Sequence, residues 1–261
     1  MADPMHQFQI SKVVDLPAVN VPGLGMVDLS ITNSTLAMMV AAVLITLFFT
    51  AVTAKPKLVP GRLQVVGEGA FAFIDDLAVS IMGEQGRAFF PFILTLFVFI
   101  LALNLLGMFT VFTATSQLAV TATFGVLTFA LVVIIGIAKN GLGFFGLFWP
   151  TSAPLLLRPV VGLIEFFSFL LRPVTLALRL FGNMLGGHVA LKIFAGFIVS
   201  LMGVALAGGV GLFALPVAAL SLGMVIALTA LEFLVAFLQA FVFAVLACIY
   251  LNDVVNLGHG H

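Results

Sequence analysis

The chain has 261 residues, of which 63% are hydrophobic and only 8% are charged, and its mean hydropathy is +1.32. A soluble domain usually has about a quarter charged residues, so this composition excludes a soluble globular protein and predicts one surrounded mainly by lipid. Ten basic and ten acidic residues give a net charge of zero, which gives no indication of a nucleic-acid partner.

Residues 1–35 form a segment with acids and prolines and without the basic-then-apolar order of a signal peptide. The first apolar run, 36–54, has the roughly 20 residues that a membrane-spanning helix needs. It is followed by 61–87, which mixes apolar residues with charged ones and predicts an amphipathic helix lying in the membrane interface. A short soluble helical hairpin is the alternative for this stretch.

Two further runs, 89–112 and 118–138, are also long enough to span the membrane. Basic residues concentrate in the cytoplasmic loops of membrane proteins. Lys55, Lys57 and Arg62 follow the first run, and Lys139 follows the third. We therefore expect the N-terminus outside and the region from Lys55 to Arg87 in the cytoplasm.

The C-terminal runs, 159–206 and 211–251, each exceed forty residues and contain no polar loop. As straight helices they would be about 60–70 Å long, twice the roughly 30 Å hydrocarbon thickness. Each run either hides a turn and forms two spans, or lies strongly tilted. We favour a tilted hairpin, because polar residues are spread along both runs. Its expected turn is the glycine-rich stretch 203–211 (GVALAGGVG). The expected fold class is thus an all-α integral membrane protein.

Ionisable residues inside a membrane are costly and usually mark a path for ions or substrate. The first long run contains five of them, and the second contains an acid and a polar amide: Glu165, Arg172, Arg179, His188 and Lys192, then Glu232 and Gln239. At about 100° per residue, Glu165 and Arg172 share a helix face with Arg179, as does Asn183. His188 points to the opposite side. An arginine does not release its proton, whereas histidine and glutamate exchange protons.

Each of these residues also has a structural interpretation. Arg179 could form an ion pair with Glu165 or Glu232, and His188 could simply fill a polar pocket. Glu165 and Arg172 could extend to the membrane surface. We expect Lys192 and Asp253 to be peripheral. His259 and His261 are assigned no role.

Three segments closely resemble subunit a of F-type ATP synthases: LRPVTLALRLFGNMLGGH (171–188), LEFLVAFLQAFVFAVLACIYL (231–251) and FFPFILTLFVFILALNLLGM (89–108). The resemblance implies a stator that faces a rotating c-ring of proteolipid subunits, each with a membrane carboxylate. It also implies peripheral-stalk b-type subunits as partners, and the catalytic F1 sector indirectly. It implies no cofactor and no metal, and no enzyme activity of the chain by itself.

Residue roles follow from the same resemblance. Arg179 matches the family's essential arginine, a charge barrier that faces the ring carboxylate between two offset half-channels. His188 and Glu232 match the polar pair of the outside half-channel. The polar lining corresponds to Asn104, Asn183 and Gln239, and the cytoplasmic half-channel to Glu165 and Ser168. Many bacterial members have an acid at the position of His188 and a histidine at the position of Glu232. This chain has the two types exchanged, as in mitochondria-like members, which suggests an alphaproteobacterial or mitochondrial lineage.

The expected location is therefore a bacterial inner membrane, with the mitochondrial inner membrane as the alternative. A self-contained secondary transporter is the competing function, but such proteins typically have an internal repeat, and we find no convincing one. The sequence also contains no GxxxxGK[ST] phosphate-binding loop. We therefore expect any ATP chemistry to take place on other subunits. Sodium in place of protons remains a narrower alternative.

Overall fold

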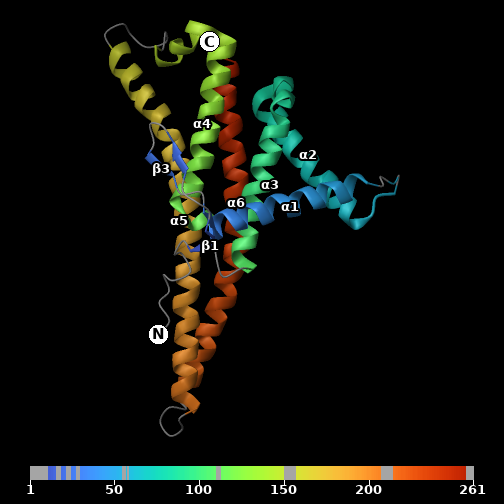
Figure 1. The fold of residues 1–261 in the computed structure, drawn as a ribbon, viewed down its shortest axis with the longest axis vertical. Coiled ribbons are helices and arrows are strands. Elements are labelled where there is room, and N and C mark those ends of the chain that lie inside the picture. Colours follow the sequence, from blue (N-terminus) through green and yellow to red (C-terminus); the bar gives the residue numbers. More distant parts are fainter. Residues whose placement is uncertain are drawn as a thin grey trace. The chain divides into compact units, whose positions relative to one another are not determined.

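The computed structural model describes residues 11–15, 19–21, 25–27, 30–54, 57, 59–109, 113–149, 157–206 and 214–256. Helices dominate it (Figure 1). The α-helices are α1 (Asn33–Thr53), α2 (Arg62–Met82), α3 (Phe90–Phe109), α4 (Leu118–Asn140), α5 (Arg158–Leu206) and α6 (Ala214–Val255). The described 3-10 helices are η2 (Gly83–Ala88), η3 (Ala114–Ser116) and η4 (Gly141–Phe148).

Five of the described helices, all except α2, are long and apolar enough to cross a membrane. This confirms the predicted all-α membrane fold. The helix α2 carries charged side chains among its apolar ones, including Glu68, Asp75 and Asp76. Its position in the membrane interface remains a prediction.

The N-terminal segment contains short strands that the sequence did not predict. β1 (Lys12–Val14) pairs antiparallel with β4 (Ile31–Thr32), and β2 (Val19–Val21) pairs antiparallel with β3 (Gly25–Val27). The helix α1 then begins at Asn33, where the Thr35 amide donates a hydrogen bond to Thr32 Oγ1 at 3.4 Å. A threonine hydroxyl at this position satisfies one of the free amides at the start of a helix.

The two C-terminal runs are each one continuous helix, of 49 residues in α5 and 42 in α6. This agrees with the hairpin and not with a hidden turn inside each run. Pro173 lies inside α5, and such a proline is tolerated in membrane helices when neighbouring groups compensate for the missing hydrogen bond. Part of the expected turn, residues 207–211, lies outside the described residues.

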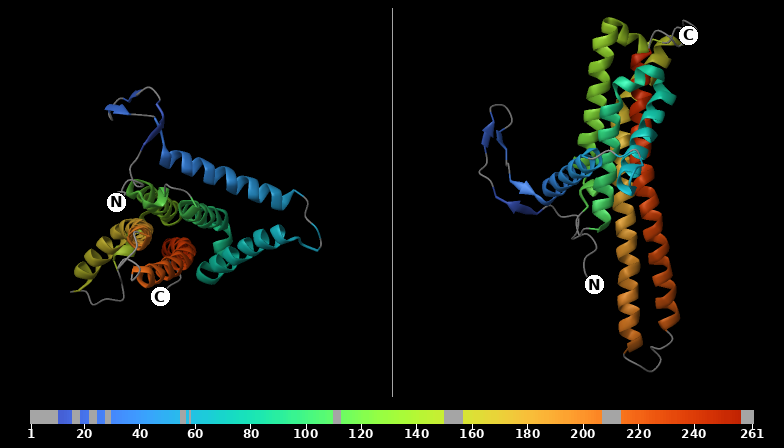
Figure 2. Two further views of the ribbon diagram at one scale, coloured as in Figure 1. Left: turned by 90° about the horizontal axis from the view of Figure 1, so that it is seen from below. Right: turned by 90° about the vertical axis from the view of Figure 1, so that its right-hand side faces the viewer.

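The chain divides into two compact units. The first unit comprises Met1–Ala41, Leu101–Gln117 and Leu180–Leu238, and the second comprises Ala42–Ile100, Leu118–Arg179 and Gln239–His261. In the first unit, the adjoining parts of α5 and α6 lie side by side (Figures 1 and 2). Leu180 and Ala236, one from each helix, are fully buried there.

In the second unit, α4 lies beside the C-terminal part of α6 (Figure 1). The Asn140 side-chain amide donates a hydrogen bond to the Val254 carbonyl at 2.6 Å. The same unit brings α4 close to α5, because an added Cβ at Gly125 would lie 2.7 Å from the Pro173 carbonyl oxygen. Glycine is therefore needed at position 125 for this approach of the two backbones.

Candidate functional site

The residues singled out from the sequence separate between the two units. The first unit holds Asn104, Asn183, His188 and Glu232, and the second holds Glu165, Ser168, Arg179 and Gln239. The group expected in the outside half-channel thus falls in one unit, together with two residues of the polar lining. The group expected in the cytoplasmic half-channel falls in the other, together with the arginine.

A cavity of about 180 Å³ opens in the first unit. Residues of α3, α5 and α6 line it: Met108, Asn183, Met184, Gly187, His188, Leu228, Leu231, Glu232 and Val235. One water needs roughly 10–15 Å³ and two to four polar partners. The cavity is therefore large enough for several waters, and Asn183, His188 and Glu232 supply polar groups to hold them.

His188 and Glu232 face each other across this cavity. His188 Nδ1 lies 4.0 Å from Glu232 Oε2, and each side chain is 11% exposed. Neither carboxylate oxygen of Glu232 has a hydrogen-bond partner among the described residues. Because 4.0 Å is too long for a direct hydrogen bond, one water or a small side-chain rotation would be needed to connect the two groups.

Gly187 lies directly against the carboxyl group of Glu232. A Cβ added at position 187 would lie 2.5 Å from Glu232 Oε1 and 3.1 Å from Cδ. A larger residue would therefore displace the carboxyl group. The absence of a side chain at Gly187 leaves the space that the carboxyl group of Glu232 occupies.

Thr113 is a site residue that the sequence analysis did not identify. Its hydroxyl oxygen lies 3.1 Å from His188 Nε2, on the opposite side of the ring from Glu232. Thr113 comes just before η3 and is 1% exposed. No spacing rule connects residues 113 and 188, so nothing in a single sequence points to this contact.

Asn104 is fully buried in α3, where its side-chain amide donates a hydrogen bond to the Ala236 carbonyl of α6 at 3.1 Å. It does not line the cavity. Its immediate effect is to fix α3 against α6, one turn away from the lining residue Met108.

Arg179 is exposed on α5 in the second unit. The apolar side chains of Leu171, Val174 and Leu178, all about half exposed, precede it on the same helix. Among the described residues of its unit, Arg179 forms neither an ion pair nor a hydrogen bond. Glu165, one of its two suggested partners, instead lies 3.7 Å from Arg172.

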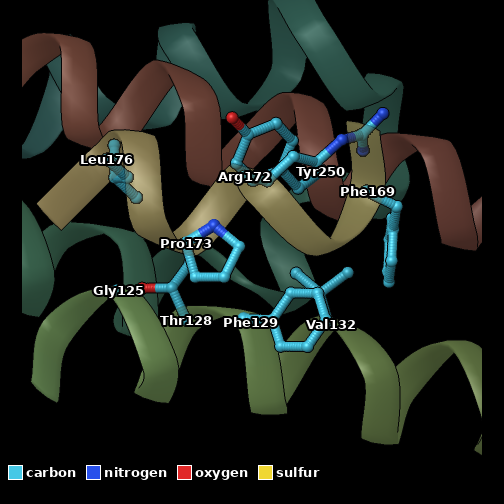
Figure 3. A pocket seen from close by; sticks show the side chains of 9 residues that line it. All are labelled: Gly125, Thr128, Phe129, Val132, Phe169, Arg172, Pro173, Leu176 and Tyr250. Atoms are coloured by element: carbon cyan, nitrogen blue, oxygen red, sulfur yellow. The ribbon is translucent and has the colours of Figure 1, made fainter. Parts of the chain in front are cut away.

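Arg172 is the centre of a polar cluster in the second unit. It donates a hydrogen bond to Asp253 Oδ2 at 2.7 Å, and it lies over the rings of Tyr250 and Phe169, at 4.7 and 5.3 Å from their centroids. Figure 3 shows Arg172, Tyr250 and Phe169 around a pocket between α4, α5 and α6. Asp253, which we expected to be peripheral, is therefore a partner of Arg172.

The remaining predicted residues lie on the same two helices. Ser168 is exposed on α5, and Gln239 is buried on α6 at 3% exposure. In the part of the chain that the structure describes, no group of three or more His, Cys, Asp or Glu side chains could hold a metal ion.

Comparisons with known proteins agree on one family. A family model described as ATP synthase A chain matches residues 35–252. The chain is 49% identical over 255 residues to ATP synthase subunit a of Hyphomonas neptunium, covering 97% of this chain and 96% of that protein. It is 46% identical over 260 residues to ATP synthase subunit a of Rhodopseudomonas palustris strain BisB18, covering 99% and 100%.

The likeness also extends to the chain's full length, with 46% identity over 261 residues to ATP synthase subunit a of Rhizobium johnstonii. Relatives this similar over almost all of both chains leave no large segment unmatched. The chain belongs to the ATP synthase A chain family.

Proposed function

We propose that this chain is the proton-conducting stator subunit of an F-type ATP synthase, and that it couples proton flow to rotation of a c-ring. In this proposal protons enter from outside past Glu232 and His188 and load a ring carboxylate. After nearly a full turn of the ring they leave towards the cytoplasm near Glu165 and Ser168. Asn183, Gln239 and, indirectly, Asn104 contribute polar groups around the route.

The observation that carries this proposal is the position of Arg179. A permanently charged guanidinium that is exposed on a membrane-spanning helix needs an anionic partner or water inside a membrane. Among the described residues of its own unit, no acidic side chain forms an ion pair with Arg179. A carboxylate on a neighbouring subunit would complete the pair and, when it moves on, leave the arginine as a barrier to direct proton leak.

The two ends of α4 support the assignment of sides. Its 23 residues correspond to about 35 Å, enough to cross the hydrocarbon core. At its C-terminal end, Lys139 donates a hydrogen bond to Gln85 of η2 at 3.1 Å, so the two predicted cytoplasmic segments lie together. The Arg172 cluster with Glu165 belongs to this end of α4. Asn140 contacts Val254, and the preceding residue, Asp253, is the hydrogen-bond partner of Arg172.

The other end of α4 follows η3 and Thr113, which contacts His188. If Lys139 is cytoplasmic, Thr113 lies towards the outside. This supports the placement of the cavity in the outside half-channel and of the N-terminus outside. The membrane is the bacterial inner membrane in this proposal.

Membership of the family makes the chain part of the ATP synthase complex. The c-ring, the peripheral-stalk b-type subunits and, indirectly, the F1 sector are its proposed partners. The chain carries protons in this proposal, and ATP is made or hydrolysed on other subunits.

Passive proton conduction in inverted vesicles stripped of the catalytic head tests the outside route. A potassium diffusion potential drives protons, and a pH-sensitive dye reports their flux. Glu232→Gln should lower the flux to below about a tenth of wild type, because an amide cannot carry the proton. Ser221→Ala is the control, since that hydroxyl donates to the Val217 carbonyl of its own helix.

Wild-type flux in Glu232→Gln at equal assembly would contradict the route. Flux through the chain reconstituted without the c-ring would instead favour the self-contained transporter.

A further inference from the structure

His188 has different neighbours at its two ring nitrogens. Nε2 lies 3.1 Å from the Thr113 hydroxyl, and Nδ1 faces Glu232 Oε2 at 4.0 Å. We propose that Thr113 is a positioning residue that holds neutral His188 with its proton on Nε2, so that Nδ1 is the proton acceptor on the Glu232 side. This inference rests on the proposed proton route and adds to it the residue that orients the imidazole.

The direction of the hydrogen bond follows from the other partner of Thr113. The hydroxyl of Thr113 has one hydrogen. Its oxygen lies 3.3 Å from the Gly107 carbonyl oxygen, which can only accept a hydrogen bond. Gly107 is among the last four residues of α3, whose carbonyls have no N–H donor further along the helix. Giving the hydrogen to this carbonyl satisfies it and leaves the hydroxyl oxygen to accept from His188.

The loop that carries Thr113 is itself held in place. The Ser116 hydroxyl donates a hydrogen bond to the Thr113 carbonyl at 2.6 Å. Thr113 is 1% exposed, so bulk water does not compete for its hydroxyl. The threonine therefore presents a fixed acceptor to the imidazole.

The consequence is a defined role for each nitrogen. A neutral imidazole has one N–H and one lone pair. With the hydrogen on Nε2, a protonated Glu232 can pass its proton through one water to Nδ1, which leaves a carboxylate and an imidazolium. The imidazolium then releases the Nδ1 proton to the next water of the cavity, and the starting tautomer is restored. The opposite tautomer would present an N–H to Glu232 and could not accept.

Among the described residues, the charged groups that act on His188 are Glu232 on α6 and Lys192, one turn further along α5. The loop before η3 contributes the neutral hydroxyl of Thr113. Of these three, Thr113 is the one that contacts Nε2. The tautomer therefore depends on a residue whose own charge does not change with pH.

The first measurement is the tautomer of His188 in the assembled complex. The subunit is labelled with 15N and 13C histidine, and His6, His259 and His261 are replaced so that His188 gives the only histidine signal of this chain. Solid-state NMR distinguishes the two neutral tautomers by their ring shifts. We expect the Nε2–H form in wild type and in Thr113→Ser, and a mixture or the Nδ1–H form in Thr113→Val.

Thr115→Val is the matched control. Thr115 is also fully buried, two residues further on, and its hydroxyl has no hydrogen-bond partner among the described residues. Its loss should leave the tautomer unchanged. An Nδ1–H form in wild type, or identical spectra for Thr113→Val and Thr115→Val, would overturn the proposal.

Passive proton flux is the second measurement. The loss of one hydrogen bond should lower the flux of Thr113→Val roughly three- to tenfold, while Thr113→Ser and Thr115→Val remain close to wild type. An altered tautomer with wild-type flux would overturn the role of Nδ1 in conduction. The NMR measurement tests the tautomer of His188 independently of the proposed proton route. Failure of the route would instead appear as wild-type flux in Glu232→Gln.

Discussion

Arg172 Nη1 lies 2.7 Å from Asp253 Oδ2, and this hydrogen bond joins α5 to α6 across 81 residues of sequence. The guanidinium also lies over the rings of Phe169 and Tyr250, at 5.3 and 4.7 Å from their centroids. Glu165, at 3.7 Å, is its second acidic neighbour. Arg172, which lies seven residues before Arg179 on α5, therefore has its acidic partners on α5 and α6.

Asp253→Ala should destabilise this helix pair by about 1–3 kcal/mol, because it removes a charge-assisted hydrogen bond from a half-buried arginine. The measurement is the temperature at which this subunit leaves the detergent-solubilised complex. Glu165→Gln is the control and should cost less than about 1 kcal/mol, since its contact is longer and more exposed. Equal shifts for the two variants would contradict the central role of the Arg172–Asp253 contact.

Gly187→Ala should lower proton flux by at least about tenfold, because the added methyl group must push the Glu232 carboxyl out of its place. Gly186→Ala provides a matched comparison, since nothing lies within 4 Å of a Cβ at position 186. Both changes raise helix propensity equally, so a difference between them reports the contact with Glu232. Similar flux in the two variants would show that the acid has room to move.

Gly125→Ala should destabilise the packing of α4 against α5 by about 1–3 kcal/mol. The methyl group would meet the Pro173 carbonyl oxygen, and backbone cannot rotate away as a side chain can. The release temperature of the subunit again measures the effect. Gly69→Ala in α2, where a Cβ meets nothing within 4 Å, should be neutral or stabilising; an unchanged release temperature in Gly125→Ala would count against the close approach.

Asn104→Leu should change stability by less than about 1 kcal/mol. The change removes one hydrogen bond, but it also removes the buried oxygen Oδ1, which has no partner among the described residues. Because Asn104 does not line the cavity, proton flux should fall by less than about threefold. A loss as large as that of Glu232→Gln would instead place Asn104 directly on the route.

The sequence predicted the main helices well because lipid imposes length and continuous hydrophobicity on them. The runs 159–206 and 211–251 were long enough to indicate two unusual helices, and α5 and α6 are continuous. The paired strands near the N-terminus were missed because segments of two or three residues are too short for a pattern of alternation. Their pairing depends on neighbours that the sequence does not specify.

The candidate site was predictable where the residue type is itself improbable. Glu232 and Arg179 stand out because charges are rare inside membrane helices. Thr113 and Gly187 are ordinary residues in an apolar chain, and they matter through one contact each. Helical spacing placed Arg172 on the face of Arg179, but it could not show that Asp253 is its partner, because that contact joins two helices.

The most direct test of the stator mechanism is ATP-driven acidification of inverted vesicles, with wild type and Arg179→Ala compared at equal assembly of the complex. We expect the variant to assemble and to lose pumping, because no fixed cation then meets the ring carboxylate or separates the two half-channels. Pumping at the wild-type rate in Arg179→Ala would contradict the proposed role of this arginine.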